Sequence, residues 1–229
     1  EGEKDTIMKP KDSIIYYKHM LQTGMMAMEP RNGHIKAWVG GVNYKYFQYD
    51  HVGQGARQVG STFKPFVYAT AIEQLGMSPC DSIIDSYFTM PKGKWGIDAD
   101  WSPKNSDGNY RGTITLQKAL ANSVNTVSAK LIDRVGPQAV VDMAKELGVT
   151  SNIPVQPSIA LGAVDITVEQ MVGAMSTFAN QGVYVKPTFI IKIENKNGVV
   201  LDQTVSYQKD VVNKDVAYAV IKLMEGVTQ

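Results

Sequence analysis

The sequence of 229 residues contains one cysteine, Cys80, and three histidines, His19, His34 and His51. A single cysteine excludes an internal disulfide bond. The histidines lie far apart, and the sequence has neither a cysteine pair nor a His-Glu-x-x-His motif, so the spacing of ligands argues against a zinc site.

An excess of charge of one sign is also lacking. Lys and Arg number 23 against 22 Asp and Glu, a net charge of +1, which argues against a nucleic-acid binder that works through a basic field. No apolar run reaches the roughly 18 residues that a membrane span needs, and the first residues do not resemble a signal peptide. With 44% hydrophobic and 20% charged residues, the composition is that of an ordinary globular chain with a sizeable core.

The first part of the chain predicts a lead-in segment, a hairpin and a helix. Residues 1–24 are polar and then mildly amphipathic, and we expect them to form a lead-in segment. Two apolar runs around Asn32-Gly33 predict a β-hairpin, followed by a loop over 42–58. A helix is predicted over Ser61–Leu75, with Pro65 in its first turn.

The rest of the chain predicts several helices and a second hairpin. Residues 77–112 are rich in Pro and Gly and indicate loops. Helical patterns follow at 114–122, 126–135 and 137–147, then from Thr167 to Ala179, and finally over 213–225. Strands are expected at 184–194 and 199–203. This order indicates an α+β or layered α/β fold with a helical insertion in the middle.

Ser61-Thr62-Phe63-Lys64 forms a Ser-x-x-Lys motif at the start of the predicted helix. Residues three apart on a helix lie on one face, so Ser61 and Lys64 are within contact range. A serine hydroxyl needs a base to become a nucleophile, and a lysine can be that base when burial or cationic neighbours lower its pKa. The helix N-terminus would favour an oxyanion formed when Ser61 attacks a carbonyl group.

This motif alone is weak evidence, because 13 serines and 19 lysines predict about one such motif by chance. The sequence has a second one, Ser206-Tyr207-Gln208-Lys209. Only the first is preceded by a glycine, Gly60, and followed by a proline and an apolar helix.

Ser123-Val124-Asn125 is the only Ser-x-Asn in the chain. It has two interpretations. Ser123 and Asn125 could simply cap the following helix. Alternatively, Ser123 relays a proton to Lys64, and Asn125 binds a substrate amide.

A phosphate-binding loop is a competing interpretation of residues 55–62, which have its glycine spacing. The lysine that should follow the second glycine is replaced by Ser61, and the contact to the β- and γ-phosphates is lost without it. We therefore favour acyl transfer over nucleotide binding.

Five stretches resemble, in the same order, the transpeptidase domain of class A penicillin-binding proteins, the bifunctional peptidoglycan synthases. They are Arg57–Phe66, Trp101–Asn105, Ala119–Asn125, Leu161–Ala163 and Phe178–Tyr184. The resemblance covers about residues 25–229, so residues 25–229 are expected to be the penicillin-binding domain, with a helical subdomain at about 77–165.

The resemblance implies a β-lactamase/transpeptidase-like α+β fold, in which an antiparallel sheet lies between helices and a helical subdomain is added. It implies that Ser61 is the acylated nucleophile, with its backbone N–H forming half of the oxyanion hole, and that Lys64 is the general base. Ser123 would be the catalytic partner from the second motif, and Asn125 would bind substrate. No metal or organic cofactor is implied.

Three features depart from the family pattern. Val59 stands where the family usually has proline. The third motif, Lys-Thr/Ser-Gly on an edge strand, does not occur in these 229 residues. We expect the gene to continue beyond Gln229 and to reach that motif, with the C-terminal strands, within a few tens of residues. The membrane anchor and glycosyltransferase domain of the family would lie upstream.

The implied reaction cross-links peptidoglycan stem peptides. Ser61 attacks the carbonyl between the last two D-alanines, D-alanine leaves, and an amine of a neighbouring stem peptide takes the acyl group. A β-lactam antibiotic would acylate Ser61 and remain there. A D,D-carboxypeptidase or β-lactamase, a penicillin sensor without turnover and a non-catalytic scaffold are the alternatives.

The expected partners are stem peptides, β-lactams and further cell-wall synthesis proteins, and not nucleic acid. The expected location is extracytoplasmic, in the periplasm or on the outer face of the bacterial inner membrane. Contact with that membrane would be made only through segments absent from this chain.

Overall fold

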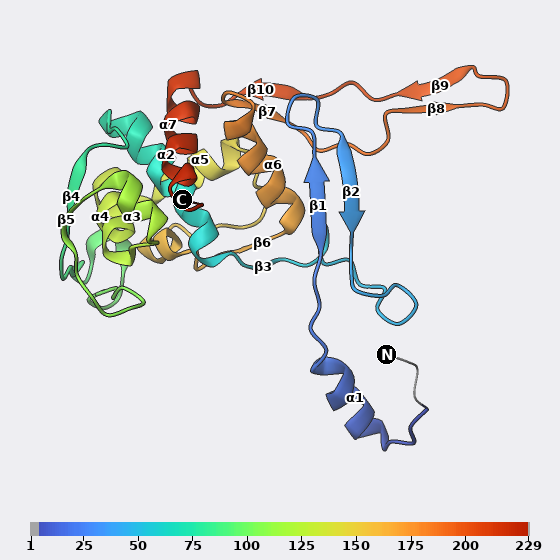
Figure 1. Cartoon of the computed structure of the whole chain (residues 1–229), viewed down its shortest axis with the longest axis horizontal. Helices are drawn as coiled ribbons and strands as arrows, with labels where there is room; N and C mark the ends of the chain where they lie inside the picture. The colour runs from blue at the N-terminus through green and yellow to red at the C-terminus, as the bar shows by residue number, and fades with distance from the viewer. Residues whose placement is uncertain (1–4, 229) are drawn as a thin grey trace.

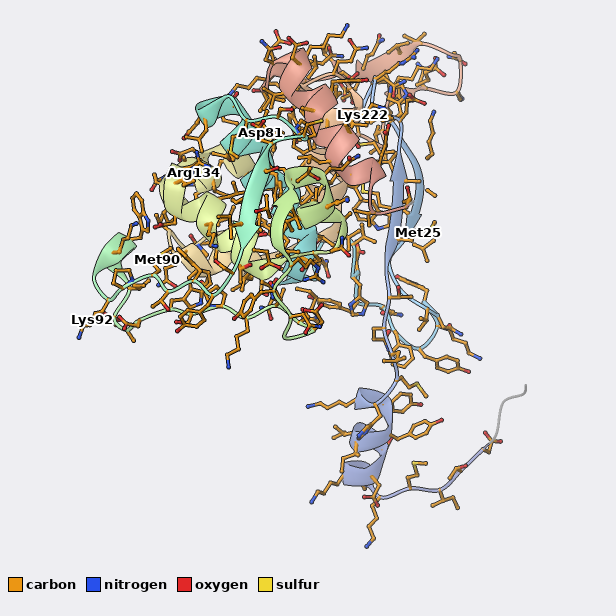
Figure 2. All side chains as sticks on the ribbon, turned by 60° about the vertical axis from the view of Figure 1, so that its left-hand side comes forward. Met25, Asp81, Met90, Lys92, Arg134 and Lys222 are labelled. Carbon is orange, nitrogen blue, oxygen red and sulfur yellow. The ribbon has the colours of Figure 1, made fainter. Side chains whose placement is uncertain are left out.

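The structure is a computed structural model that describes residues 5–228. The first four residues of the predicted lead-in segment and Gln229 lie outside the described residues. Helix α1 (Pro10–Lys18) projects from the packed body, as Figures 1 and 2 show. None of its residues is buried. One edge-to-face contact, between the rings of Tyr17 and Phe47 at 5.8 Å, ties it to the following loop region.

The predicted hairpin around Asn32-Gly33 is confirmed. Strands β1 (Met25–Met28) and β2 (Ile35–Val39) pair antiparallel, with Met25 opposite Val39. Gly33 has φ +75°, and a Cβ there would collide with the carbonyl oxygen of Lys186, so this turn needs glycine. Figure 1 shows helix α6 (Val168–Ala179) between this hairpin and the other helices, and α6 packs against β1.

Helix α2 (Lys64–Leu75) lies at the centre of the core. Its residues from Lys64 to Ile72 are all buried, a pattern typical of a helix enclosed on every side. It packs against α4 (Asn125–Val135), α5 (Pro137–Glu146) and α7 (Lys214–Glu225). The helix predicted from Ser61 begins with a short 3₁₀ turn, η1 (Gly60–Phe63), before α2 starts.

The other predicted helices are confirmed to within two residues at their ends. They are α3 (Leu116–Ala121), α4, α5, α6 and α7. Thr167 caps α6 by accepting a hydrogen bond from the backbone N–H of Gln170, as its place in the sequence predicted. A further 3₁₀ turn, η3 (Pro157–Leu161), packs against η1 and α4.

Two predictions about strands were wrong. The region expected to be loops contains β4 (Ser82–Asp85), which pairs with β5 (Gly112–Thr115), and a turn, η2 (Lys94–Gly96). The single strand expected at 184–194 is two strands. Its first part, β7 (Val183–Val185), pairs with β10 (Gln208–Asp210). Its second part, β8 (Lys192–Glu194), pairs with β9 (Val200–Gln203), which confirms the predicted second hairpin. Pro187 lies between β7 and β8 and has no N–H for a continuous ladder.

The described strands form five antiparallel pairs, of which the last joins β3 (Arg57–Gln58) to β6 (Asp165–Ile166). This short pair leads directly into η1, the turn that contains Ser61. The mixture of helices and antiparallel strands agrees with the α+β class predicted from the sequence.

Candidate active site

Ser61 lies in the 3₁₀ turn η1, with its side chain exposed. The turn is anchored from behind by two backbone hydrogen bonds that continue the β3–β6 pair. The N–H of Val59 donates to Val164 O at 3.0 Å, and the N–H of Gly60 donates to Gly162 O at 3.1 Å. Gly60 and Gly162 both have positive φ, at +55° and +74°. Ser61 is therefore placed by backbone contacts on its N-terminal side and by α2 on the other.

Lys64, at the start of α2, is fully buried. Its Nζ donates hydrogen bonds to Ser123 O at 2.7 Å, to Ser123 Oγ at 3.0 Å and to Asn125 Oδ1 at 2.7 Å. All three acceptors are neutral groups. Burial lowers the pKa of Lys64 from 10.5 to about 8, so an appreciable fraction of the amine is neutral near physiological pH.

Ser123 connects Lys64 to Ser61. Its Oγ donates to Ser61 Oγ at 2.9 Å and accepts from Lys64 Nζ. The three side chains thus form a continuous chain of hydrogen bonds from the exposed hydroxyl of Ser61 to the buried amine. Ser123 has φ +51°, an uncommon conformation for a residue other than glycine, which commonly marks functional sites.

Asn125 is the first residue of α4, and its amide group bridges two segments. Its Oδ1 accepts from Lys64, and its Nδ2 donates to Lys104 O at 2.9 Å. The residue at the N-cap of α4 is Val124, which offers no side-chain hydrogen bond. The side chains of Ser123 and Asn125 contact Lys64 and do not cap the helix, so the capping interpretation of the Ser-x-Asn motif was wrong.

The second Ser-x-x-Lys motif has no such arrangement. Ser206 Oγ donates to Asn32 O at 2.9 Å, and Lys209 forms an exposed ion pair with Glu146. The two members of this motif have different partners in different parts of the fold. The context of Gly60 and Pro65 in the sequence thus distinguished the assembled motif from the chance occurrence.

Asn105 also belongs to this region, although the sequence analysis assigned it no role. It is buried, and its Oδ1 accepts from the backbone N–H of Asn125 at 2.9 Å and from that of Thr126 at 3.2 Å. The signal in the sequence was its place at the end of the Trp101–Asn105 stretch. A hollow of about 150 Å³ beside Ser123 and Asn105 is also lined by Arg111.

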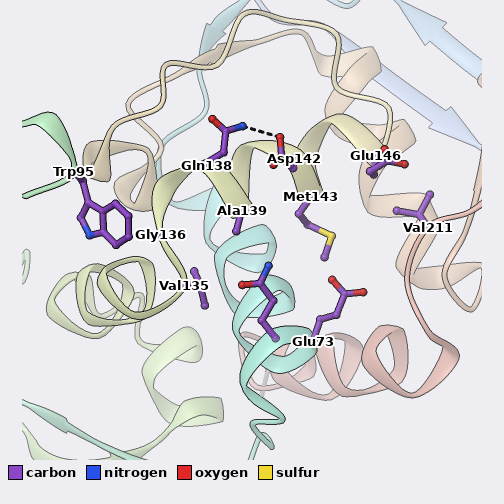
Figure 3. A pocket seen from close by; sticks show the side chains of 11 residues that line it. Glu73, Trp95, Val135, Gly136, Gln138, Ala139, Asp142, Met143, Glu146 and Val211 are labelled. Carbon is purple, nitrogen blue, oxygen red and sulfur yellow. Dashed lines mark hydrogen bonds between the residues drawn. The ribbon is translucent and has the colours of Figure 1, made fainter.

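A larger cavity, of about 480 Å³, lies away from these residues. Figure 3 shows that it is lined mainly by α2 and α5, with Glu73, Asp142 and Glu146 among its side chains. None of the four residues predicted for the site lines it. Within residues 5–228, no group of three or more His, Cys, Asp or Glu side chains could hold a metal ion. No helix over the same residues is long and apolar enough to cross a bilayer.

Residues 23–229 match the penicillin binding protein transpeptidase domain. The chain belongs to this family. The match covers the whole hydrogen-bonded site and nearly all of the described structure.

Curated relatives identify the branch of the family. The chain is 36% identical over 210 residues to penicillin-binding protein 1A of Aquifex aeolicus. The matched segment covers 90% of this chain and 28% of the relative. It is 35% identical to penicillin-binding protein 2D of Bacillus subtilis, covering 90% of this chain and 30% of the relative. The chain therefore spans less than a third of these relatives, and it is a class A transpeptidase domain, as the sequence motifs indicated.

Solved structures show the same fold. Penicillin-binding protein 1A of Haemophilus influenzae matches with a TM-score of 0.80 and 25% identity over 87% of this chain and 34% of that chain. PonA1 of Mycobacterium tuberculosis matches with a TM-score of 0.76 and 28% identity over 93% of this chain and 58% of that chain. PonA1 has also been solved in complex with penicillin V. The predicted β-lactamase/transpeptidase-like fold is thereby confirmed.

In this family context, Val59 has a visible structural consequence. Its φ of −76° would suit the proline that the family usually has at this position. Its N–H, however, donates to Val164 O, a bond that proline could not form. The valine thus adds one backbone hydrogen bond to the turn that carries Ser61.

Proposed function

We propose that this domain is a serine-type D-Ala-D-Ala transpeptidase that works through an acyl-Ser61 intermediate and is acylated by penicillin. The observation that carries the proposal is the chain of hydrogen bonds Ser61–Ser123–Lys64, which ends on a buried lysine surrounded by neutral acceptors. An exposed hydroxyl connected to a lysine of lowered pKa has the properties of an activated nucleophile.

In the proposed acylation step, Ser61 Oγ attacks the carbonyl carbon between the two terminal D-alanines. The proton of Ser61 passes to Ser123 Oγ as the proton of Ser123 passes to neutral Lys64. The tetrahedral intermediate then collapses, the C–N bond breaks, and the departing D-alanine amine takes the proton from Lys64 by the reverse route. The product is an ester between Ser61 and the stem peptide.

In the second step an amine of a neighbouring stem peptide attacks this ester and loses a proton to Lys64. An amide bond forms, the ester C–O bond breaks, and Ser61 Oγ takes the proton back from Lys64 through Ser123. The backbone N–H of Ser61 would contribute one donor to the oxyanion hole. Asn125 is the proposed substrate-binding residue, and its Nδ2 would have to exchange the carbonyl of Lys104 for one of the substrate.

The test is intact mass spectrometry of the natural full-length protein after exposure to penicillin. One adduct on Ser61 is expected. It should disappear in Ser61→Ala and form far more slowly in Lys64→Ala. Ser206→Ala and Lys209→Ala are the matched controls, because they alter the second Ser-x-x-Lys motif, and both should acylate as the wild type does. An adduct that survives Ser61→Ala would contradict the proposal.

The alternatives are separated by the products formed from a stem-peptide substrate. A transpeptidase releases D-alanine and forms a cross-linked peptide when an acceptor amine is present. A D,D-carboxypeptidase releases D-alanine without the cross-link. A penicillin sensor forms the adduct and releases no D-alanine from the peptide.

For the whole protein we propose the organisation of its class A relatives. Residues 25–229 would be the transpeptidase domain, with the helical subdomain at about 77–165 and the Lys-Thr/Ser-Gly motif downstream. A membrane anchor and a peptidoglycan glycosyltransferase domain would lie upstream. The domain would then act outside the cytoplasm on stem peptides, together with other cell-wall synthesis proteins. Reading the gene on both sides of this segment tests the proposal directly.

A further inference from the structure

A buried polar cluster lies directly behind the Ser123–Asn125 turn. It joins Asp85 at the end of β4, Asn105 in a loop and Thr126 in α4, which are 1%, 6% and 0% exposed. Both oxygens of Asp85 accept from Asn105 Nδ2, at 2.9 and 3.2 Å. Asp85 also accepts from the Thr126 hydroxyl and, at 2.9 Å, from the backbone N–H of Arg111. None of these groups has a part in the proposed acyl transfer.

Asn105 provides the cap that α4 lacks. The first N–H groups of a helix have no partner within the helix, and the N-cap Val124 has no side-chain acceptor. Asn105 Oδ1 accepts from the N–H groups of Asn125 and Thr126, from a segment 20 residues away. The start of α4 is therefore fixed by a residue outside the helix.

Asp85 determines which way the Asn105 amide points. An ionised carboxylate only accepts hydrogen bonds, so the NH₂ group of Asn105 must face Asp85 and its oxygen must face α4. Burial alone would raise the pKa of Asp85. Hydrogen bonds from Thr126 and Asn105, the backbone N–H of Arg111 and the Arg111 charge outweigh burial and keep that pKa below its usual value. The carboxylate remains ionised at neutral pH, and the amide orientation is fixed.

The turn held in this way supplies all three hydrogen-bond acceptors of Lys64 within the described residues. These are the carbonyl and hydroxyl oxygens of Ser123 and Oδ1 of Asn125. Ser123 is in a left-handed conformation, which is strained for a residue other than glycine and persists only where the surroundings enforce it. The cap on Asn125 and Thr126 lies two and three residues after this strained residue and opposes its relaxation.

We propose that Asn105, oriented by Asp85, is a positioning residue that holds Ser123 and Asn125 against Lys64. The inference rests on the proposed function, because it assigns Asn105 a role in keeping the proton relay assembled. Within the described residues no hydrogen bond joins Asn105 to Ser61 or to Lys64, so Asn105 acts through the turn.

The first test measures the second-order rate of acylation by fluorescent penicillin in the full-length protein as a function of pH. Asn105→Ala should slow acylation at pH 7 by about tenfold or more, because the relay atoms lose their fixed position. A loosened turn also exposes Lys64 to water, so the pH midpoint of acylation should move upward, toward the 10.5 of an unperturbed lysine. Thr167→Ala is the matched control, since it removes the cap of α6, and its pH midpoint should be unchanged.

Exchange of the two side chains provides the rescue. Asn105→Asp alone should slow acylation, because it places a second carboxylate against Asp85. Adding Asp85→Asn restores one charge and one amide to the pair, with a carboxylate oxygen facing the helix N–H groups in place of the amide oxygen of Asn105. The double variant should recover part of the rate that Asn105→Asp loses, since the bond from Asn105 Nδ2 to Asn109 O is not restored.

A second measurement does not depend on penicillin. The reactivity of Lys64 toward an amine-directed reagent, followed by peptide mass spectrometry across pH, reports its protonation directly. Asn105→Ala should move the pH midpoint of Lys64 labelling upward whether or not Ser61 is acylated. If Ser61 is never acylated but this shift is observed, the proposed function is refuted and the positioning role of Asn105 stands. If the wild type acylates and Asn105→Ala changes neither profile, Asn105 is not a positioning residue.

Discussion

Substitution of Gly162 tests whether the backbone behind Ser61 sets its reactivity. A Cβ at Gly162 would lie 2.5 Å from the Cα of Gly60 and would collide with its carbonyl group, whereas Cβ contacts under 3.0 Å essentially never occur. In Gly162→Ala the two backbones must therefore separate by at least 0.5 Å. That movement disturbs the bonds from Gly60 to Gly162 and from Val59 to Val164, which hold the turn carrying Ser61.

The expected cost has two parts. The left-handed conformation of Gly162, with φ +74°, costs about 1 kcal/mol for alanine in any surroundings. The backbone collision adds to this, for a total of about 2–4 kcal/mol in unfolding free energy. Because Ser61 follows Gly60 directly, we also expect acylation by penicillin to fall by a factor of about ten to a hundred.

Gly198→Ala is the matched control. Gly198 has φ +78° in the turn between β8 and β9, and a Cβ there would meet nothing within 4 Å. It should lose only about 1 kcal/mol and acylate at the wild-type rate. The assay combines denaturant unfolding with acylation kinetics at a temperature where all variants are folded. If Gly162→Ala and Gly198→Ala prove equal in both measurements, the close approach of the two backbones does not position Ser61.

Four further predictions concern Lys64, Thr167 and Val59. With a Lys64 pKa of about 8, the neutral fraction, and with it the acylation rate, should rise about tenfold between pH 7 and pH 9; a flat profile would contradict Lys64 as the base. The unfolded chain, with a lysine pKa of 10.5, binds more protons than the folded one between these two pKa values, so stability should increase with pH from about 8 to 10.5, and Lys64→Met should remove this increase in denaturant titrations. Thr167→Ala removes the acceptor for the Gln170 N–H and should lower the unfolding free energy by about 1 kcal/mol, with no loss expected if the cap is unimportant. Val59→Pro loses the bond to Val164 but restricts the unfolded chain at a compatible φ of −76°, so calorimetry should show a change within about 1 kcal/mol, and a larger loss would mean that the bond dominates.

Elements with local signals in the sequence could be predicted. Gly136-Pro137 separates α4 from α5, Thr167 begins α6, and Asn32-Gly33 turns the first hairpin. Each of these signals acts through the conformation or hydrogen bonds of residues within one turn of the chain. Periodicity and capping therefore sufficed to place these elements.

Pairings between distant segments could not be predicted in the same way. Strand β4 is four residues long in a region rich in Pro and Gly, and it is defined by its partner β5, about 30 residues away. Similarly, β7 pairs with β10 across the intervening β8–β9 hairpin, although the nearer apolar strand had been the expected partner. Such strands are stabilised by contacts with the partner strand, and a local sequence pattern does not show which segment that partner is.

For the site, the motifs indicated which side chains were involved but not how they are connected. The sequence placed Ser61 and Lys64 on one helix face, yet their link in the structure runs through Ser123 from another helix boundary. That link depends on the positive φ of Ser123 and on Asn105, which holds the following residues. Neither could be found from residue spacing.

The division of partners between the two buried charged residues explains why Lys64 can serve as a base. Asp85 accepts hydrogen bonds from Asn105, Thr126 and the Arg111 backbone N–H, whereas Lys64 donates to Ser123 and Asn125. A carboxylate in direct contact with Lys64 would stabilise the ammonium form and raise its pKa. The amide side chains of Asn105 and Asn125 instead connect the two residues through neutral groups, so that burial acts on the lysine unopposed. The same amides that order the site thus also keep the Asp85 carboxylate from stabilising the protonated form of Lys64.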